Sequence, residues 1–272
     1  MDELFRGSLS EKLNLAPVQI KARAIVTKND SIRIAAHRGY AAAYPENTLV
    51  AMQAAVEAGV RAVEIDIQFT RDACPVLLHD VTFKRTGNCT RRVFDLDLAE
   101  ARTLLVNEPL RFPGQYPDVY CNSLDEFAAF LSSNEGVQAF VEIKQESIDL
   151  FGPDLVIEQI RKSLQQVARQ CVIISYSARF LALVRKQLQW PVGHILTRWN
   201  EQCLLAATEL QPEYVICNHT KIPANTDFRK DSWQWLLYEI SSCKQLNHYA
   251  ERGVQWVESM DPVVLLNCNS GS

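Results

Sequence analysis

Two histidines and two carboxylates, close together in the stretch 34–80, could carry out acid–base and metal chemistry. His37 and His79 each follow a short apolar run, and between them Glu64 and Asp66 alternate with apolar residues. Side chains at i and i+2 of a strand share a face, so the two carboxylates lie side by side. Their burial would be costly without a neutralising partner, and Mg2+ or Ca2+ is the hard cation that oxygen ligands favour. This spacing alone leaves open the alternative of a solvated strand face with unpaired acids.

Six short motifs, in this order and spacing, resemble the glycerophosphodiester phosphodiesterase family, a branch of the phospholipase-C-like phosphodiesterases. They are His37-Arg38-Gly39, Pro45-Glu46-Asn47-Thr48, Glu64-Ile65-Asp66, His79-Asp80, Arg85-Thr86 and Glu142-Ile143-Lys144. The resemblance extends from about residue 32 to residue 262.

The resemblance implies a metal-dependent enzyme with a small-molecule phosphodiester substrate. A divalent ion, Mg2+ or Ca2+, would be bound by Glu64, Asp66 and Glu142. The reaction would be hydrolysis of a glycerophosphodiester to an alcohol and sn-glycerol 3-phosphate. Two alternatives stay open: a lysophospholipase-D-like or sphingomyelinase-D-like activity on lipid diesters, and a catalytically inactive binding barrel.

The remaining motif residues have implied roles in catalysis and substrate binding. His37 and His79 resemble the acid–base pair, because histidine exchanges protons near neutral pH. Arg38 and Lys144 resemble phosphate contacts, and Glu46 resembles a supporting residue near the metal or His37. Which histidine is the acid is not indicated by the sequence.

Three places depart from the family's motifs. The usual Asp-Gly turn is Asp72-Ala73, the usual Trp-Thr-Val-Asn is residues 238–241 (Tyr-Glu-Ile-Ser), and the closing Thr-Asp is replaced around Ser259-Met260. We expect Ala73 to adopt an ordinary backbone conformation or a different turn, since alanine lacks glycine's freedom. The C-terminal changes affect the pocket wall and therefore bear on substrate choice more than on reaction class.

Short apolar runs alternate with helical patterns after residue 30, which predicts an α/β protein with a parallel sheet. Size and strand number favour a (β/α)8 TIM barrel, with the site residues at the carboxyl ends of its strands. We expect one domain at 31–265 and an N-terminal extension at 1–30. Nine strands are predicted, one too many, at 32–37, 61–68, 76–79, 137–144, 171–176, 192–197, 214–218, 235–240 and 254–258. Because 70–75 is too short for a parallel crossover, 61–80 could instead be one strand with a hairpin-like return.

Composition indicates the cellular compartment and the kinds of binding partner expected for this 272-residue chain. Its net charge of −4 argues against nucleic-acid binding. No apolar run approaches the roughly 20 residues of a transmembrane helix, and no signal peptide is apparent. The eight cysteines form no C-x-x-C pair, so we expect reduced thiols and a cytoplasmic protein. The oligomeric state is not readable from the sequence.

Overall fold

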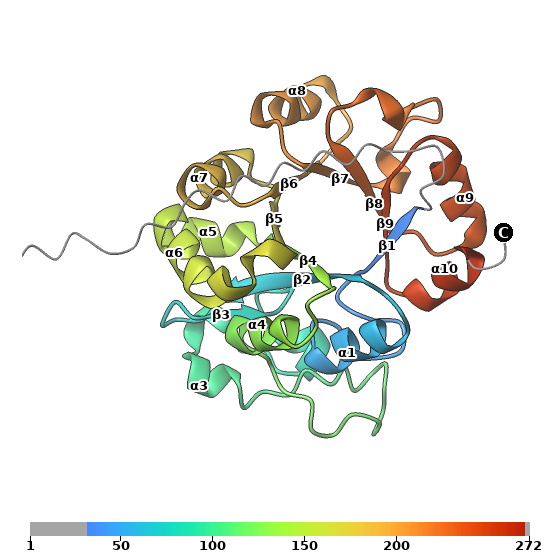
Figure 1. The fold of residues 1–272 in the computed structure, drawn as a ribbon. Helices are drawn as coiled ribbons and strands as arrows, with labels where there is room; N and C mark the ends of the chain where they lie inside the picture. The colour runs from blue at the N-terminus through green and yellow to red at the C-terminus, as the bar shows by residue number, and fades with distance from the viewer. Residues whose placement is uncertain (1–31, 270–272) are drawn as a thin grey trace, which may run out of the picture. The chain divides into compact units, whose positions relative to one another are not determined.

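The computed structural model describes residues 32–269, which fold into a closed barrel of eight parallel strands with helices outside it (Figure 1). Around the barrel the order is β1-β9-β8-β7-β6-β5-β4-β2, and β1 pairs with β2 to close it. The strands are β1 Arg33–Ala36, β2 Ala62–Phe69, β4 Gln138–Ile143, β5 Cys171–Ser175, β6 Val192–Ile195, β7 Tyr214–Asn218, β8 Gln234–Tyr238 and β9 Trp256–Ser259. The predicted (β/α)8 barrel is confirmed.

The ninth predicted strand is a hairpin-like return and not a barrel stave. β3 (Pro75–Leu77) runs antiparallel to β2, with Ile67 opposite Leu77. The turn between them places Ala73 at φ 58°, in the left-handed region. The expectation of an ordinary conformation for Ala73 is therefore wrong: the short antiparallel connection imposes a left-handed residue, whichever side chain stands there.

Helices connect the strands, and several begin at polar caps. They are α1 Leu49–Glu57, α2 Lys84–Gly87, α3 Leu98–Ala101, α4 Leu124–Ser132, α5 Gln145–Phe151, α6 Pro153–Leu164, α7 Ala178–Leu188, α8 Glu201–Leu210, α9 Cys243–Glu251 and α10 Pro262–Asn269. Thr48 caps α1, and Ser123 forms a capping box with Glu126 at the start of α4. These caps accept hydrogen bonds from backbone N–H groups of the first turn, which have no carbonyl partner within the helix.

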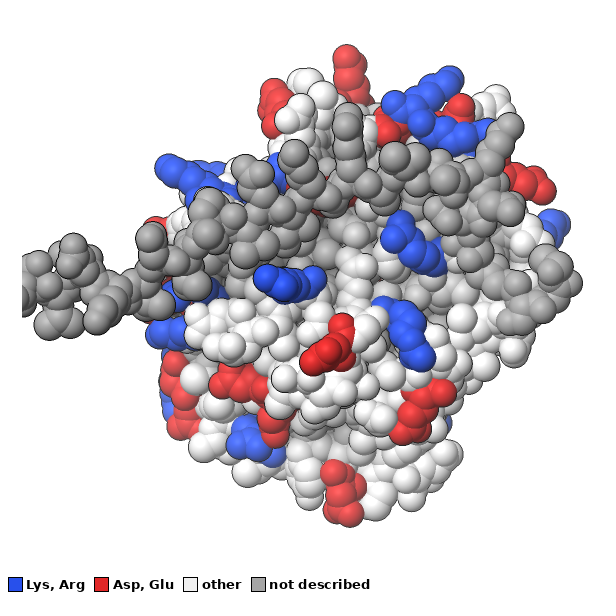
Figure 2. All heavy atoms as spheres, in the orientation of Figure 1, with Lys and Arg blue, Asp and Glu red and all other residues white. Residues whose placement is uncertain are grey.

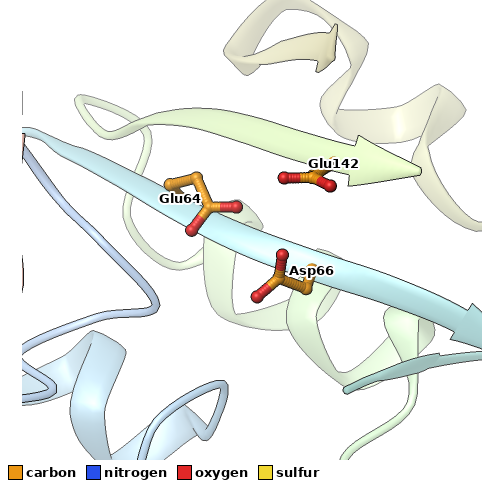
Figure 3. Close-up of side chains that lie close together, drawn as sticks. All are labelled: Glu64, Asp66 and Glu142. Carbon is orange, nitrogen blue, oxygen red and sulfur yellow. The ribbon is translucent and has the colours of Figure 1, made fainter. Parts of the chain in front are cut away.

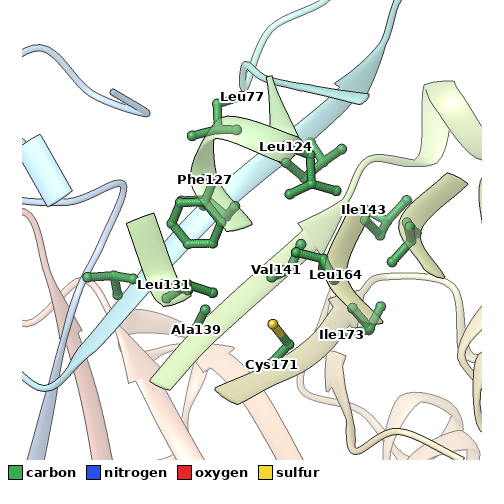
Figure 4. Close-up of a cluster of buried hydrophobic side chains, with 14 of the residues drawn as sticks. Leu77, Leu124, Phe127, Leu131, Ala139, Val141, Ile143, Leu164, Cys171 and Ile173 are labelled. Carbon is green, nitrogen blue, oxygen red and sulfur yellow. The ribbon is translucent and has the colours of Figure 1, made fainter. Parts of the chain in front are cut away.

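Two apolar layers surround the strands. Outside the barrel, α4 packs Leu124, Phe127 and Leu131 against the outward side chains of β2, β4 and β5 (Figure 4). Inside, Phe140 of β4 meets Trp256 of β9 edge to face, with ring centroids 5.5 Å apart. Two residues further along the same strands stand polar side chains, so the aromatic rings form an apolar layer beneath the candidate site.

The cysteine prediction is wrong for one pair. Cys243 at the start of α9 is bonded to Cys268 in α10, whereas the other six cysteines are free. The two lie 25 residues apart in sequence and become neighbours because α9 and α10 pack against each other. The cytoplasmic location, which rested partly on reduced thiols, stays a prediction.

Other expectations are tested only in part. The predicted extension 1–30 lies outside the described residues, so the domain boundaries stay predictions. Among residues 32–269, no helix has both the length and the apolar character to cross a bilayer. Acidic and basic side chains are interspersed on the face in Figure 2, without a continuous basic patch among its described atoms. The absence of nucleic-acid binding stays a prediction.

Candidate active site

Three buried carboxylates meet at one point of the barrel interior. Glu64 and Asp66 extend from β2 and Glu142 from the neighbouring β4, with Asp66 and Glu142 opposite each other in the register. Their side chains point toward a shared space (Figure 3), and one oxygen of each lies within 4.8 Å of the others. The i, i+2 spacing predicted from the sequence thus brings the acids together, and the strand pairing supplies the third.

The three carboxylates are not equivalent electrostatically. Burial, together with the charges of Asp66, Glu258 and Glu142, raises the pKa of Glu64 well above its ordinary value. Burial likewise raises the pKa of Glu142, although Lys144 opposes this. Burial would also raise the pKa of Asp66, but Lys144 and Arg38 lower it far below the ordinary value. Asp66 therefore carries the firmest negative charge of the three.

Two cations border the cluster. Arg38 has a left-handed backbone (φ 58°), and its Nε lies 3.0 Å from Asp66 Oδ2. Lys144 follows β4 directly and places Nζ 2.5 Å from Asp66 Oδ1 and 2.7 Å from Glu142 Oε1. Asn47, also left-handed at φ 53°, donates to Asp66 Oδ2 and accepts from the Asp66 N–H. Such unusual backbone conformations persist where surrounding contacts hold them.

His37 leaves the end of β1 and is held at both sides of its ring. Its Nδ1 contacts the carboxylate of Glu239, which follows β8, and its Nε2 lies 3.8 Å from Glu64 Oε2. Burial would lower the pKa of His37, but the hydrogen bond with Glu239 and the charge of Glu258 raise it overall. Because Nδ1 is held by Glu239, His37 faces the carboxylate cluster with Nε2.

His79 follows β3 and is anchored beside the same cluster. The backbone N–H of Leu78 donates to the Asp66 carbonyl, and the Gln68 amide donates to the His79 carbonyl. Nδ1 of His79 lies 2.6 Å from Asp80 Oδ1. The hairpin-like return thus brings the second histidine to the strand that carries two of the acids.

A chain of ion pairs supports Asp80. Arg85 donates to both oxygens of Asp80 and to both oxygens of Glu46. Glu46 also accepts from Arg38, and its backbone N–H donates to Glu108. Burial would raise the pKa of Glu46, but Arg85 and Arg38 lower it. Glu46 links the two arginines instead of lying among the three carboxylates.

Comparison with known protein families gives a match over most of the chain. A model of the "Glycerophosphoryl diester phosphodiesterase family" matches residues 37–257. The chain belongs to this family.

The similar relatives and solved structures have phosphodiesterase names. Glycerophosphodiester phosphodiesterase 1 of Bos taurus is 35% identical over 145 residues, which cover 52% of this chain and 44% of the relative. The alignment thus spans less than half of that relative's length. A glycerophosphodiester phosphodiesterase of Caldanaerobacter subterraneus is 24% identical over 86% of this chain and 96% of its own. An Oleispira antarctica phosphodiesterase, solved with its product sn-glycerol-3-phosphate, has the same fold, with a TM-score of 0.78 and 20% identity. The match covers 88% of this chain and 97% of that structure.

Two acidic residues of this family member were not singled out from its sequence. Glu239 contacts His37, and Glu258 of β9 is buried in the barrel with an Oε1 that has no hydrogen-bond partner. Burial, opposed by His37, raises the pKa of Glu258 to about 7. The sequence signal for Glu258 was its place in β9 two residues after Trp256, on the face of the strand that points into the barrel. The signal for Glu239 was that it stands where the family usually has threonine.

The residues present fit a divalent cation. The cluster offers three carboxylates, the hard oxygen donors that Mg2+ and Ca2+ require. Glu64 Oε1 is buried and has no hydrogen-bond donor, a costly state that a bound cation would relieve.

Proposed function

We propose that this protein is a metal-dependent phosphodiesterase that hydrolyses glycerophosphodiesters to an alcohol and sn-glycerol 3-phosphate. The observation that carries the proposal is the convergence of three buried carboxylates, two cations and two carboxylate-paired histidines at one end of the barrel. Family membership and the Oleispira antarctica product complex support the substrate class.

The metal would be held by Glu64, Asp66 and Glu142. As a bound Lewis acid it would stabilise the negative charge that develops on the phosphoryl oxygens. Among the chain's own groups, Arg38 and Lys144 would attract the phosphate through their positive charges. Both cations contact Asp66, so their positions are fixed before the substrate arrives.

His37 and His79 would move the protons of the reaction. One would accept a proton from the attacking hydroxyl, and the other would donate a proton to the leaving oxygen. Each has Nδ1 on a carboxylate, so each can use Nε2 toward the substrate.

The decisive assay is hydrolysis of a panel from glycerophosphocholine to lysophospholipids, with Mg2+, Ca2+ or Mn2+ and with EDTA. We expect release of glycerol 3-phosphate from the glycerophosphodiesters only when metal is present. Turnover confined to lysophospholipids would instead favour the lysophospholipase-D-like alternative. A complete lack of turnover would favour the inactive binding barrel. Cytoplasmic location and a role in lipid or glycerol metabolism are further parts of the proposal.

A change of leaving group separates the roles of the two histidines. His37→Ala and His79→Ala should each reduce turnover by roughly 10² to 10⁴. A p-nitrophenyl ester needs no proton on its leaving group, so it should restore turnover only in the variant that lost the acid. Equal rescue of both variants, or of neither, would contradict this division of roles.

A further inference from the structure

We propose that Glu239 is a positioning residue that fixes the tautomer of His37 and so makes its Nε2 the nitrogen that exchanges protons. This rests on the proposed function, in which His37 acts as acid or base. Glu239 lies directly after β8, on the opposite side of β9 from β1, and comes close to His37 because β9 pairs with both β1 and β8.

Both carboxylate oxygens of Glu239 are engaged. Oε1 accepts from the backbone N–H of Met260 at 2.7 Å, and Oε2 contacts Nδ1 of His37. The backbone N–H of His37 in turn donates to the Ser259 carbonyl at 2.9 Å. The carboxylate and the imidazole are thus fixed to the same end of β9, which limits rotation of the histidine ring.

The chemistry of the partner determines where the imidazole proton lies. A carboxylate only accepts hydrogen bonds, so Nδ1 of His37 must carry the hydrogen that it donates. In the neutral ring Nε2 is then left with a free lone pair, 3.8 Å from Glu64 Oε2 at the carboxylate cluster. A threonine, the usual residue of the family here, could donate as well as accept and would not impose this choice.

The substitution Glu239→Gln should reverse the tautomer without a change in shape. The Met260 N–H requires an acceptor, so the glutamine carbonyl should remain on it and direct the amide NH2 toward His37. An NH2 group donates, and Nδ1 would have to accept, which moves the ring hydrogen to Nε2. We expect kcat to fall by roughly 10² to 10⁴, with KM little changed because ground-state binding is not involved.

A matched control tests for a general effect of losing a carboxylate. Glu213 also accepts from one backbone N–H and one side chain, Val192 and Arg185, and its side chain is 35% exposed against 33% for Glu239. It lies before β7, at the other end of the barrel. Glu213→Gln should leave kcat unchanged, and Glu239→Asp, which keeps a carboxylate acceptor, should recover part of the activity.

Nitrogen-15 NMR of the histidine ring gives a readout that does not depend on activity. At alkaline pH, where the ring is neutral, the wild type should show the hydrogen on Nδ1 of His37, and Glu239→Gln should show it on Nε2. His37→Ala assigns the signals. The wild-type spectrum alone is informative if the glutamine variant does not fold: a hydrogen on Nε2 there would overturn the inference.

The outcomes distinguish this inference from the proposed function. If the wild type hydrolyses no diester but Glu239→Gln still reverses the tautomer of His37, the proposed function is refuted and the positioning role remains. An active wild type whose Glu239→Gln variant keeps the original tautomer would refute the positioning role, even if turnover falls. Reversal of the tautomer with unchanged kcat would also refute it.

Discussion

At the scale of single residues, Glu258 is a buried carboxyl group that has no assigned role in metal binding or catalysis. Its pKa is about 7 in the folded chain, whereas the pKa of a glutamate in an unfolded chain is about 4.3. The folded state therefore favours the protonated form of Glu258. This preference adds to the free energy of unfolding, and its contribution is fully present below about pH 4.3. That contribution is lost as the pH rises through about 7.

Glu258→Gln removes this charge and should stabilise the metal-free protein at high pH. We expect the free energy of unfolding at pH 8 in EDTA to rise by roughly 1 to 3 kcal/mol, with the gain disappearing near pH 4. Urea denaturation across this range measures it. As a control, Glu209→Gln on the exposed face of α8 should change stability by less than about 0.5 kcal/mol at any pH. A gain that is the same at pH 4 and pH 8 would show that charge is not the cause.

Residues inside a short motif could be predicted from the sequence, whereas partners across the barrel could not. His37 and Asp66 stand in motifs whose local spacing already indicates a shared strand face or strand end. The contact between His37 and Glu239 joins residues 202 positions apart, so it depends on the pairing of β9 with both β1 and β8. Glu46 was assigned a supporting role near the metal or His37, and its link between Arg38 and Arg85 required the loop geometry.

At the scale of secondary-structure elements, strands were predicted more accurately than the connections between them. Buried parallel strands are continuous apolar runs and stand out in the sequence. By contrast, α5 begins directly after Lys144 with no loop, and α10 is a short apolar segment that begins at Pro262, so the sequence does not mark either one as a separate helix. The β2–β3 turn was predicted with the wrong conformation, because the antiparallel pairing decides it and the side chain does not.

The left-handed Ala73 predicts that glycine is the better residue in this turn. A residue with a Cβ in the left-handed region loses about 1 kcal/mol relative to glycine. Ala73→Gly should therefore raise the free energy of unfolding by about this amount, measured by urea denaturation. The same substitution at Ala99, exposed in the helix α3, should lower it by about 1 kcal/mol. A loss of stability in both variants would contradict the left-handed turn.

At the scale of the whole molecule, the candidate metal site couples neighbouring strands to the closure of the barrel. β2 carries two of the acids, β4 the third, and β2 is also the strand against which β1 closes. His37 and Glu239 extend the same network to β1 and β8. Like charges in this network oppose folding without a counter-ion, so a bound cation should stabilise the barrel as a unit.

We therefore expect a divalent cation to raise the melting temperature. At a concentration about 100 times the dissociation constant, binding adds about 2.7 kcal/mol, which corresponds to roughly 5 to 10 °C for a domain of this size. Differential scanning calorimetry with EDTA, Mg2+ or Ca2+ measures the shift.

Glu64→Gln gives the sharper test, because it removes both a metal ligand and a carboxylate whose pKa is raised by burial. Its metal-free melting temperature should rise at pH 8, while the increase produced by the cation should largely disappear. Glu213→Gln should keep the full increase. An equal increase in the wild type and in Glu64→Gln would mean that the cation binds elsewhere, and no increase in the wild type would refute the metal site.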